Sequence, residues 1–313
     1  MSVSQAELIV DRRQMKARLF RWRIAAVMAV FAAFASLFWT GGDFKKYSSH
    51  IARVRIEGLI TGDQATLNLL DEIANSEKVA AVIIRIDSPG GTTAGSEAIY
   101  EKIRVIAKGK PVVAVMDTVA ASGGYITAIA AEYIVARGNT ITGSIGVIFS
   151  FPEISKLLDT LGIKMEEIKS GELKAEPSPY KPVTDRARQV SNEMVQESFG
   201  WFTGLVAERR NLSIERVKVL ADGRVYTGRQ AVAAKLIDAL GGEEVALEWL
   251  QTRKSVSKDL EVLDWVNPIN VDPTGLGFSV ADTLIQLLGF DGLKRRVESA
   301  RLDGLLVLWH PQL

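Results

Sequence analysis

A serine between an apolar strand pattern and an alanine-rich helix pattern is the side chain best suited to chemistry in this chain. It is Ser122, within the run AASGGY at residues 120–125. On the first turn of a helix, its hydroxyl would lie beside backbone N–H groups that have no partner inside the helix. Small residues are also favoured where a helix packs tightly on a sheet. The residues alone therefore leave a nucleophile and a packing role as alternatives.

A serine nucleophile needs a base, and the composition points to lysine for that role. The chain has no cysteine, and its two histidines lie more than seventy residues from Ser122. A free lysine has a pKa of about 10.4, and lowering it to about 7 by burial requires about 4.6 kcal/mol. The nearby candidates are Lys169, Lys174 and Lys181, and each has a solvated surface position as its alternative. Lys174 lies in GELKAEP, residues 171–177, which we expect to form a loop able to fold over a cleft.

A glycine pair could supply hydrogen-bond donors to the same site. The run DSPGG at residues 87–91 follows a continuous β-branched run at 79–86. Ligands of α/β sheets bind at this carboxyl edge of the strands. If the N–H groups of Gly91 and Gly123 converge, they form an oxyanion hole for an acyl-transfer intermediate. A plain strand-to-helix turn is the alternative.

Strand and helix patterns alternate through the middle of the chain. Apolar runs predict strands at residues 53–57, 79–86, 111–116, 133–136 and 145–148. Helical spacing predicts helices at 67–73, 99–106, from 122, and at 184–210, with Ser213 and Thr227 as N-caps of two more. The helix after Thr227 is expected to end at Gly241 and Gly242. Such βαβ repetition predicts an α/β fold with a mainly parallel sheet and right-handed crossovers.

The N-terminal segment predicts a membrane anchor. Residues 24–39 carry no charge, and six Lys or Arg side chains precede them between residues 12 and 23. Trp22 and Trp39 lie at the two ends, where amphipathic rings favour the membrane–water boundary. At about 1.5 Å per residue the run covers about 24–28 Å, enough for a thin bilayer. The cationic flank should stay in the cytoplasm, which places the later residues outside it. A signal peptide cleaved near Ala33-Phe34-Ala35 and a buried core helix are the alternatives.

The patterns together divide the chain into five segments. They are a cytoplasmic tail (1–23), a transmembrane anchor (24–40), a linker (41–52), an α/β domain (53–252) and a C-terminal extension (253–313). The extension ends in the apolar run LLVLW at 305–309, which we expect to pack, to contact the membrane, or to occupy a subunit's own cleft and be trimmed. A net charge of +1 gives no reason to expect nucleic acid as a partner. The lack of cysteine excludes thiolate metal sites and disulfides.

Five runs over residues 53–250 resemble, in the family's order, the signal peptide peptidases of the SppA type. The runs are DSPGG at 87–91, AASGGY at 120–125, TGSIGV at 142–147, KSG at 169–171 through Lys174, and ADGRVYTG at 221–228. This family belongs to a serine peptidase clan related by fold to ClpP and crotonase. Any one run alone would be a weak match, whereas five in order are specific. One departure is Ala175, where some relatives have an acidic residue.

The resemblance implies a membrane-anchored serine endopeptidase with a ClpP/crotonase-like fold and a Ser/Lys dyad. It makes Ser122 the nucleophile and Lys174 the general base, with Ser144 holding the lysine amine. Gly91 and Gly123 would supply the oxyanion N–H groups, and neither a cofactor nor a metal is expected. We expect the run at 222–224 to be structural, a turn with a buried Arg–Asp pair.

The resemblance also implies an assembly and a substrate class. The family's short form is a ring-like homo-oligomer of about eight subunits, in which Lys174 reaches the Ser122 of a neighbouring subunit. Its substrates would be remnant signal peptides and other unfolded apolar segments. They would be cut on the periplasmic or extracytoplasmic side of the bacterial cytoplasmic membrane, with residues 24–40 contacting lipid.

Two alternatives belong to other functional classes. A crotonase-like acyl-CoA enzyme would use the same glycine N–H pair on a thioester, without a serine nucleophile. The expected anchor and the lack of an evident basic site for CoA phosphates argue against it. A non-catalytic membrane scaffold would keep the fold without turnover. The presence of both Ser122 and Lys174 argues against that reading.

Overall fold

The structure is a computed structural model that describes residues 18–30, 46, 48–266 and 306–308. The chain divides into two units, Met1–Ser48 and Ser49–Leu313. In the first unit, residues 18–30 form a helix with exposed side chains. The expected anchor at 24–40 therefore lies partly outside the described residues. Among the helices that are described, none combines the length and the apolar character needed to cross a membrane.

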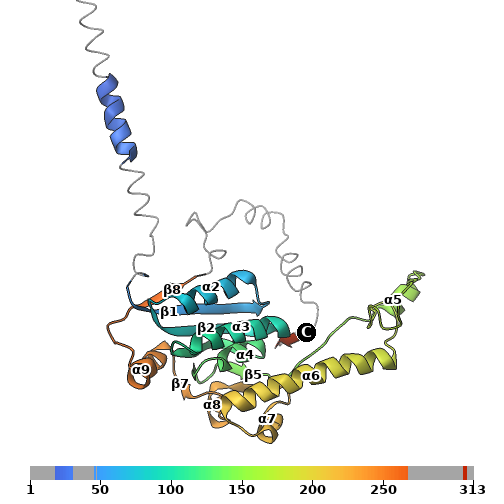
Figure 1. Ribbon diagram of the computed structural model, residues 1–313. Coiled ribbons are helices and arrows are strands. Elements are labelled where there is room, and N and C mark those ends of the chain that lie inside the picture. The colour runs from blue at the N-terminus through green and yellow to red at the C-terminus, as the bar shows by residue number, and fades with distance from the viewer. Residues whose placement is uncertain (1–17, 31–45, 47, 267–305, 309–313) are drawn as a thin grey trace, which may run out of the picture. The chain divides into compact units, whose positions relative to one another are not determined.

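Long apolar runs form the centre of one sheet in the second unit (Figure 1). β1 (His50–Ile60), β2 (Val79–Thr92) and β3 (Val112–Ala121) are parallel neighbours, and β4 (Tyr133–Ala136) runs parallel to the first half of β3. β-branched residues fill these strands because both faces of the sheet are covered. The expected α/β class with a mainly parallel sheet is confirmed, and so are four of the five expected strands.

Shorter strands extend the sheet on both sides. β5 (Ile141–Gly143) pairs with the second half of β3 and, antiparallel, with β6 (Val225–Thr227). β7 (Ala239–Leu240) pairs with β4. On the opposite side, β8 (Val262–Trp265) runs parallel to β1. Part of the expected C-terminal extension is therefore a strand of the main sheet.

Helices cover the two faces of the sheet unequally. The larger core packs one face against α2 (Gln64–Asn75), α3 (Thr93–Ala107) and α4 (Gly123–Ile129). The smaller core packs the other face against α9 (Glu243–Arg253). The remaining helices are α5 (Ser155–Thr160), α6 (Asp185–Arg210), α7 (Ile214–Leu220) and α8 (Gly228–Ala233). The expected N-caps Ser213 and Thr227 are both confirmed, since each side chain accepts a hydrogen bond from its first helical turn.

The helix that begins after Ser122 is held along its whole length. All seven residues of α4 are buried. The Tyr125 hydroxyl donates to the Leu236 carbonyl at 2.8 Å. At the end of the helix, Arg209 and Arg104 donate to the carbonyls of residues 129–131 at 2.9–3.1 Å. These guanidinium groups satisfy carbonyls that a helix end leaves without intrahelical partners, so α4 is a rigid support.

Three local expectations are wrong. The chain at 145–148 forms no extended strand, because Ser144 adopts a positive φ of 49° and ends β5 at Gly143. The helix after Thr227 ends at Ala233, well before the glycine pair, since Lys235 has a φ of 61° and the chain turns into the core. The DSPGG run is the last part of β2 itself, not a turn that follows it. The registers of β1 and β2 shift there, which lets the strand continue through the glycines.

Candidate active site

Ser122 lies where β3 ends and α4 begins. Its backbone has φ 54° and ψ −113°, and a sparsely populated conformation of this kind costs about 1–3 kcal/mol. Two hydrogen bonds hold it there: its N–H donates to the Gly143 carbonyl at 2.8 Å, and its carbonyl accepts from Ile126 at 2.9 Å. The residue is 1% exposed, and its hydroxyl makes no hydrogen bond with any described residue. A sharp strand-to-helix turn is one way to present a nucleophilic hydroxyl.

Backbones approach closely around the expected oxyanion glycines. A Cβ on Gly91 would lie 1.9 Å from the Ile60 carbonyl oxygen of β1, and one on Gly124 would lie 2.7 Å from the Ser88 carbonyl oxygen. Because α4 packs against β2, Gly91 and Gly123 belong to the same corner of the fold. Close packing accounts for the absence of side chains at positions 91 and 124. The convergence of the Gly91 and Gly123 N–H groups stays a prediction.

Ser88 holds the chain that leads to Gly91. Its fully buried hydroxyl donates to the Gly58 carbonyl at 2.6 Å and accepts from the Gly90 N–H at 3.0 Å. Next to it, the Asp87 carboxylate accepts from the Val119 N–H of β3 at 3.0 Å. These side chains tie three neighbouring strands together beside the candidate site. The sequence pattern did not single them out, because Asp and Ser before Pro-Gly-Gly are typical of turns.

The end of β2 also pairs with a strand from the C-terminal part of the chain. β9 (Leu306–Leu308) runs antiparallel to the segment Gly90–Thr92. At this point β1 occupies one edge of β2, and β3 leaves the other edge after Ala120. Because a strand has two edges, β9 takes the edge that β3 leaves, beside the turn that carries Ser122. This edge therefore accepts an extended antiparallel chain. For residues 306–308 of the apolar C-terminal run, the pairing shows packing on the sheet, whereas occupation of a cleft and trimming stay predictions.

Ser144 lies next to the same turn. It follows Gly143, whose carbonyl holds the Ser122 N–H, and its own N–H donates to the Arg224 carbonyl at 2.9 Å. Ser144 is 8% exposed. The Arg224 side chain pairs with Asp222 at 2.5 Å, but the two side chains are 66% and 42% exposed. The expectation of a buried Arg–Asp pair is therefore wrong, since this turn lies at the surface.

The three candidate lysines differ in what their amines contact. Lys169 Nζ lies 2.8 Å from Glu167 and 2.9 Å from Glu176, and these carboxylates raise the pKa of Lys169 above its usual range, Glu167 most strongly. Lys181 Nζ lies 2.5 Å from Glu176. Lys174 is exposed, and its amine makes no hydrogen bond or ion pair with the described residues. Of the three, Lys174 is the one whose amine forms no ion pair with a carboxylate of the described residues.

Lys174 lies in a projecting segment, residues 148–183, which we call the arm. Figure 1 shows α5, within the arm, beyond the far end of α6 and away from β2 and α4. Its exposed large apolar side chains are Ile148, Leu157, Leu161, Ile163, Met165, Ile168, Leu173 and Tyr180. The structure brings Ser122, Ser144 and the glycines to one corner. Within the described part of the chain, no hydrogen bond or ion pair joins Lys174 to that corner.

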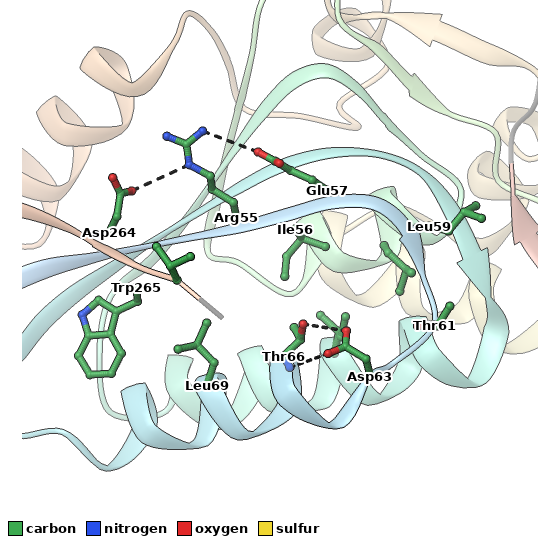
Figure 2. Close-up of a pocket in the computed structure, with 13 residues that line it drawn as sticks. Arg55, Ile56, Glu57, Leu59, Thr61, Asp63, Thr66, Leu69, Asp264 and Trp265 are labelled. Atoms are coloured by element: carbon green, nitrogen blue, oxygen red, sulfur yellow. Dashed lines mark hydrogen bonds and ion pairs between the residues drawn. The ribbon is translucent and has the colours of Figure 1, made fainter. Parts of the chain in front are cut away.

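A pocket of about 470 Å³ lies elsewhere, between β1, α2 and residues 264–266 (Figure 2). At its rim, Arg55 reaches toward Glu57 at 3.7 Å and Asp264 at 4.0 Å. None of the candidate site residues lines this pocket. Two of its lining residues, Leu59 and Ile60, pair with Gly90 and Gly91 of β2, so the pocket adjoins the strand segment that carries the expected oxyanion glycine.

Comparisons with known proteins place relatives of this chain among the peptidases. Residues 104–257 match peptidase family S49. A Synechocystis protein that is named as a protease is 37% identical over 218 residues, which cover 69% of this chain and 78% of that protein. The chloroplastic serine protease SPPA of Arabidopsis thaliana is 33% identical over 302 residues, covering 84% of this chain and 44% of its own length. Protease 4 of Haemophilus influenzae is 32% identical over 225 residues, covering 69% of this chain and 36% of its own length.

Proposed function

The chain belongs to peptidase family S49, the SppA family of serine peptidases, and from that membership we propose that Ser122 is its nucleophile and Lys174 its general base. The observation that carries the proposal is the strained, buried turn at Ser122, whose hydroxyl no described residue holds. Strain of this kind clusters at functional sites, where the surrounding structure maintains it. The complementary feature is the amine of Lys174, which no described residue pairs with.

The proposed reaction is peptide hydrolysis through an acyl-enzyme. Neutral Lys174, oriented by Ser144, takes the Ser122 proton as the hydroxyl oxygen attacks the scissile carbonyl. The Gly91 and Gly123 N–H groups stabilise the oxyanion of the tetrahedral intermediate. The protonated lysine then gives its proton to the leaving amine. Water, deprotonated by the same lysine, hydrolyses the ester and regenerates the serine.

The base in this proposal comes from a neighbouring subunit. The arm projects from the domain and exposes a series of apolar side chains, and clustered exposure of this kind marks protein interfaces. A repeated head-to-tail contact that closes on itself gives a ring, here of about eight subunits. Each Ser122 would then meet the Lys174 of the next subunit. The site would be complete only in the assembly.

The proposed substrates are remnant signal peptides and other unfolded apolar segments. The edge of β2 beside Ser122 accepts an extended antiparallel chain, which suits an unfolded segment and excludes a folded one. Residues 24–40 would anchor the protein in the bacterial cytoplasmic membrane, with 1–23 in the cytoplasm. The linker, expected at 41–52 but followed by β1 from His50, would lead to the peptidase domain and its extension on the extracytoplasmic side. This topology brings the site to the surface where such peptides remain.

Labelling with an active-site phosphonate tests the nucleophile directly. The full-length protein in detergent is expected to gain one phosphonate per active serine by intact mass, and Ser122→Ala is expected to gain none. A crotonase-like acyl-CoA enzyme or a non-catalytic scaffold would remain unlabelled in both forms. Labelling of Ser122→Ala at an unchanged rate would place the nucleophile at another residue.

Replacing Ser88 with alanine is expected to weaken both the fold and catalysis. The change removes the hydroxyl that bonds the Gly58 carbonyl and leaves the buried Gly90 N–H without its acceptor, which lowers the free energy of unfolding by about 1–3 kcal/mol. It also frees the chain that positions the Gly91 donor, so kcat falls about tenfold. Urea unfolding and peptide cleavage measure the two effects.

Thr203→Ala is the matched control for Ser88→Ala. Thr203 is 2% exposed, and the partners of its hydroxyl among the described residues are two carbonyls of its own helix, α6. We expect it to lower stability while leaving kcat within about twofold of the wild type. Equal kcat values for the two variants would contradict a positioning role for Ser88.

A further inference from the structure

Four charged side chains close the loop that carries Lys174. The Glu176 carboxylate, with its side chain 3% exposed, lies 2.9 Å from Lys169 Nζ and 2.5 Å from Lys181 Nζ. Glu167 lies 2.8 Å and 3.6 Å from the same two amines. We call Glu167, Lys169, Glu176 and Lys181 the neck cluster. It joins chain on both sides of Lys174, so it fixes the two ends of the loop against each other.

The tip between these ends is tightly turned. The Lys174 N–H donates to the Gly171 carbonyl at 3.1 Å, and the Glu176 N–H donates to the Leu173 carbonyl at 3.3 Å. Ala175 has a positive φ of 59°. With the neck closed and the tip turned, the backbone of Lys174 has a defined place at the end of the loop. The direction in which its amine leaves the arm therefore depends on the neck cluster.

The neck cluster also pairs the carboxylates that flank Lys174 in sequence. Hydrogen bonds from Lys181 and Lys169 lower the pKa of Glu176 to about 2, so this carboxylate is ionised at neutral pH. An unpaired carboxylate near Lys174 would favour the charged form of the amine, which is inactive as a base. Two amines and two carboxylates sum to no net charge. The remaining acid at the tip, Glu172, is exposed and makes no ion pair with Lys174 among the described residues.

We propose that the neck cluster is a positioning device for the base: it directs the Lys174 amine and keeps Glu167 and Glu176 from pairing with it. The inference rests on the proposed catalytic role of Lys174 and adds residues that contact neither the substrate nor Ser122. A cluster that only stabilised the arm would change activity equally at every pH. A cluster that sets the charge around the base moves the pH at which activity appears.

The pH dependence of kcat/KM for a synthetic signal peptide tests this proposal. Its acid limb reports deprotonation of the base in the free enzyme. Glu176→Gln leaves the cluster with a net positive charge, which lowers the pKa of Lys174 and moves the acid limb to lower pH. Lys169→Gln leaves a net negative charge, which raises that pKa and moves the limb to higher pH. Each shift is expected to be about half a pH unit, the size of one charge acting through partly solvated protein.

Matched variants distinguish the effect of charge near Lys174 from an effect on the folding of the arm. The double variant Lys169→Gln/Glu176→Gln restores zero net charge, so its acid limb should return to the wild-type position, with a lower kcat because the neck is open. Glu166→Gln and Lys164→Gln make the same charge changes at exposed residues of the arm that have no described ion pair, and no shift is expected for them. Native mass spectrometry confirms that every variant assembles as the wild type does.

Two outcomes would overturn one proposal without the other. If Glu176→Gln and Lys169→Gln lower activity at all pH values with no opposed shifts, the neck cluster is only structural. In that case Lys174→Ala would still be inactive, and the proposed dyad of Ser122 and Lys174 would be retained. If Lys174→Ala is fully active, the dyad itself is wrong, whatever the cluster variants do.

Discussion

Lys174→Ala is expected to lower kcat for cleavage of a synthetic signal peptide about 10⁴-fold, with KM changed by less than about threefold. Without a base, the Ser122 hydroxyl keeps its proton and attacks the carbonyl poorly. When two residues act together in catalysis, removing either one lowers kcat almost as much as removing both. The single substitution is therefore expected to cause this large a loss of kcat. Lys174→Arg should be equally inactive, because a guanidinium cannot lose its proton at neutral pH.

The other lysines of the arm provide the contrast. Lys169→Ala and Lys181→Ala should lower kcat by no more than about tenfold, because their amines are held by carboxylates and act through the neck. Lys164→Ala should behave as the wild type. A 10⁴-fold loss in Lys169→Ala together with an active Lys174→Ala would transfer the role of base to Lys169.

Local patterns in the sequence predicted four of the nine strands described in the sheet, among them the three longest, and the position of Ser122. The central strands are buried on both faces, so their β-branched runs stand out in the sequence. Two helices begin where the hydroxyl of Ser213 or Thr227 accepts a hydrogen bond from the N–H three residues later. This spacing is also a local signal in the sequence. Ser122 was recognisable because small residues mark the junction of a strand pattern and a helix pattern.

Contacts between segments that are distant in the chain could not be predicted from local sequence patterns. Ser88 bonds to a carbonyl thirty residues earlier, so its role depends on the register of β1 against β2. That register also keeps the DSPGG run in the sheet. The strand expected at 145–148 fails because Ser144 turns the chain, although its apolar residues suit a strand. For the base, the residues alone left three lysines as candidates, and only the family resemblance favoured Lys174. The ion pairs of Lys169 and Lys181 are contacts that the sequence pattern did not predict, and the role of Lys174 stays a prediction.

Mixing two inactive variants is expected to restore activity if the base acts between subunits. Ser122→Ala subunits still supply Lys174, and Lys174→Ala subunits still supply Ser122. In rings assembled from equal amounts, half of the subunits carry the serine, and half of their neighbours independently carry the lysine. About one quarter of the sites are then complete, so about one quarter of the wild-type kcat should return. Each variant alone should remain inactive.

The way the recovered activity depends on the mixing ratio distinguishes a base acting between subunits from other causes of recovered activity. With a fraction x of one variant, complete sites follow x(1 − x), so activity should peak at equal amounts and fall symmetrically to zero. Mixing Lys174→Ala with the double variant Ser122→Ala/Lys174→Ala should give no activity, because no subunit supplies the amine. Native mass spectrometry must first show that mixed rings form. If they form and remain inactive at every ratio, serine and lysine come from the same subunit, and the arm must then fold back on its own domain.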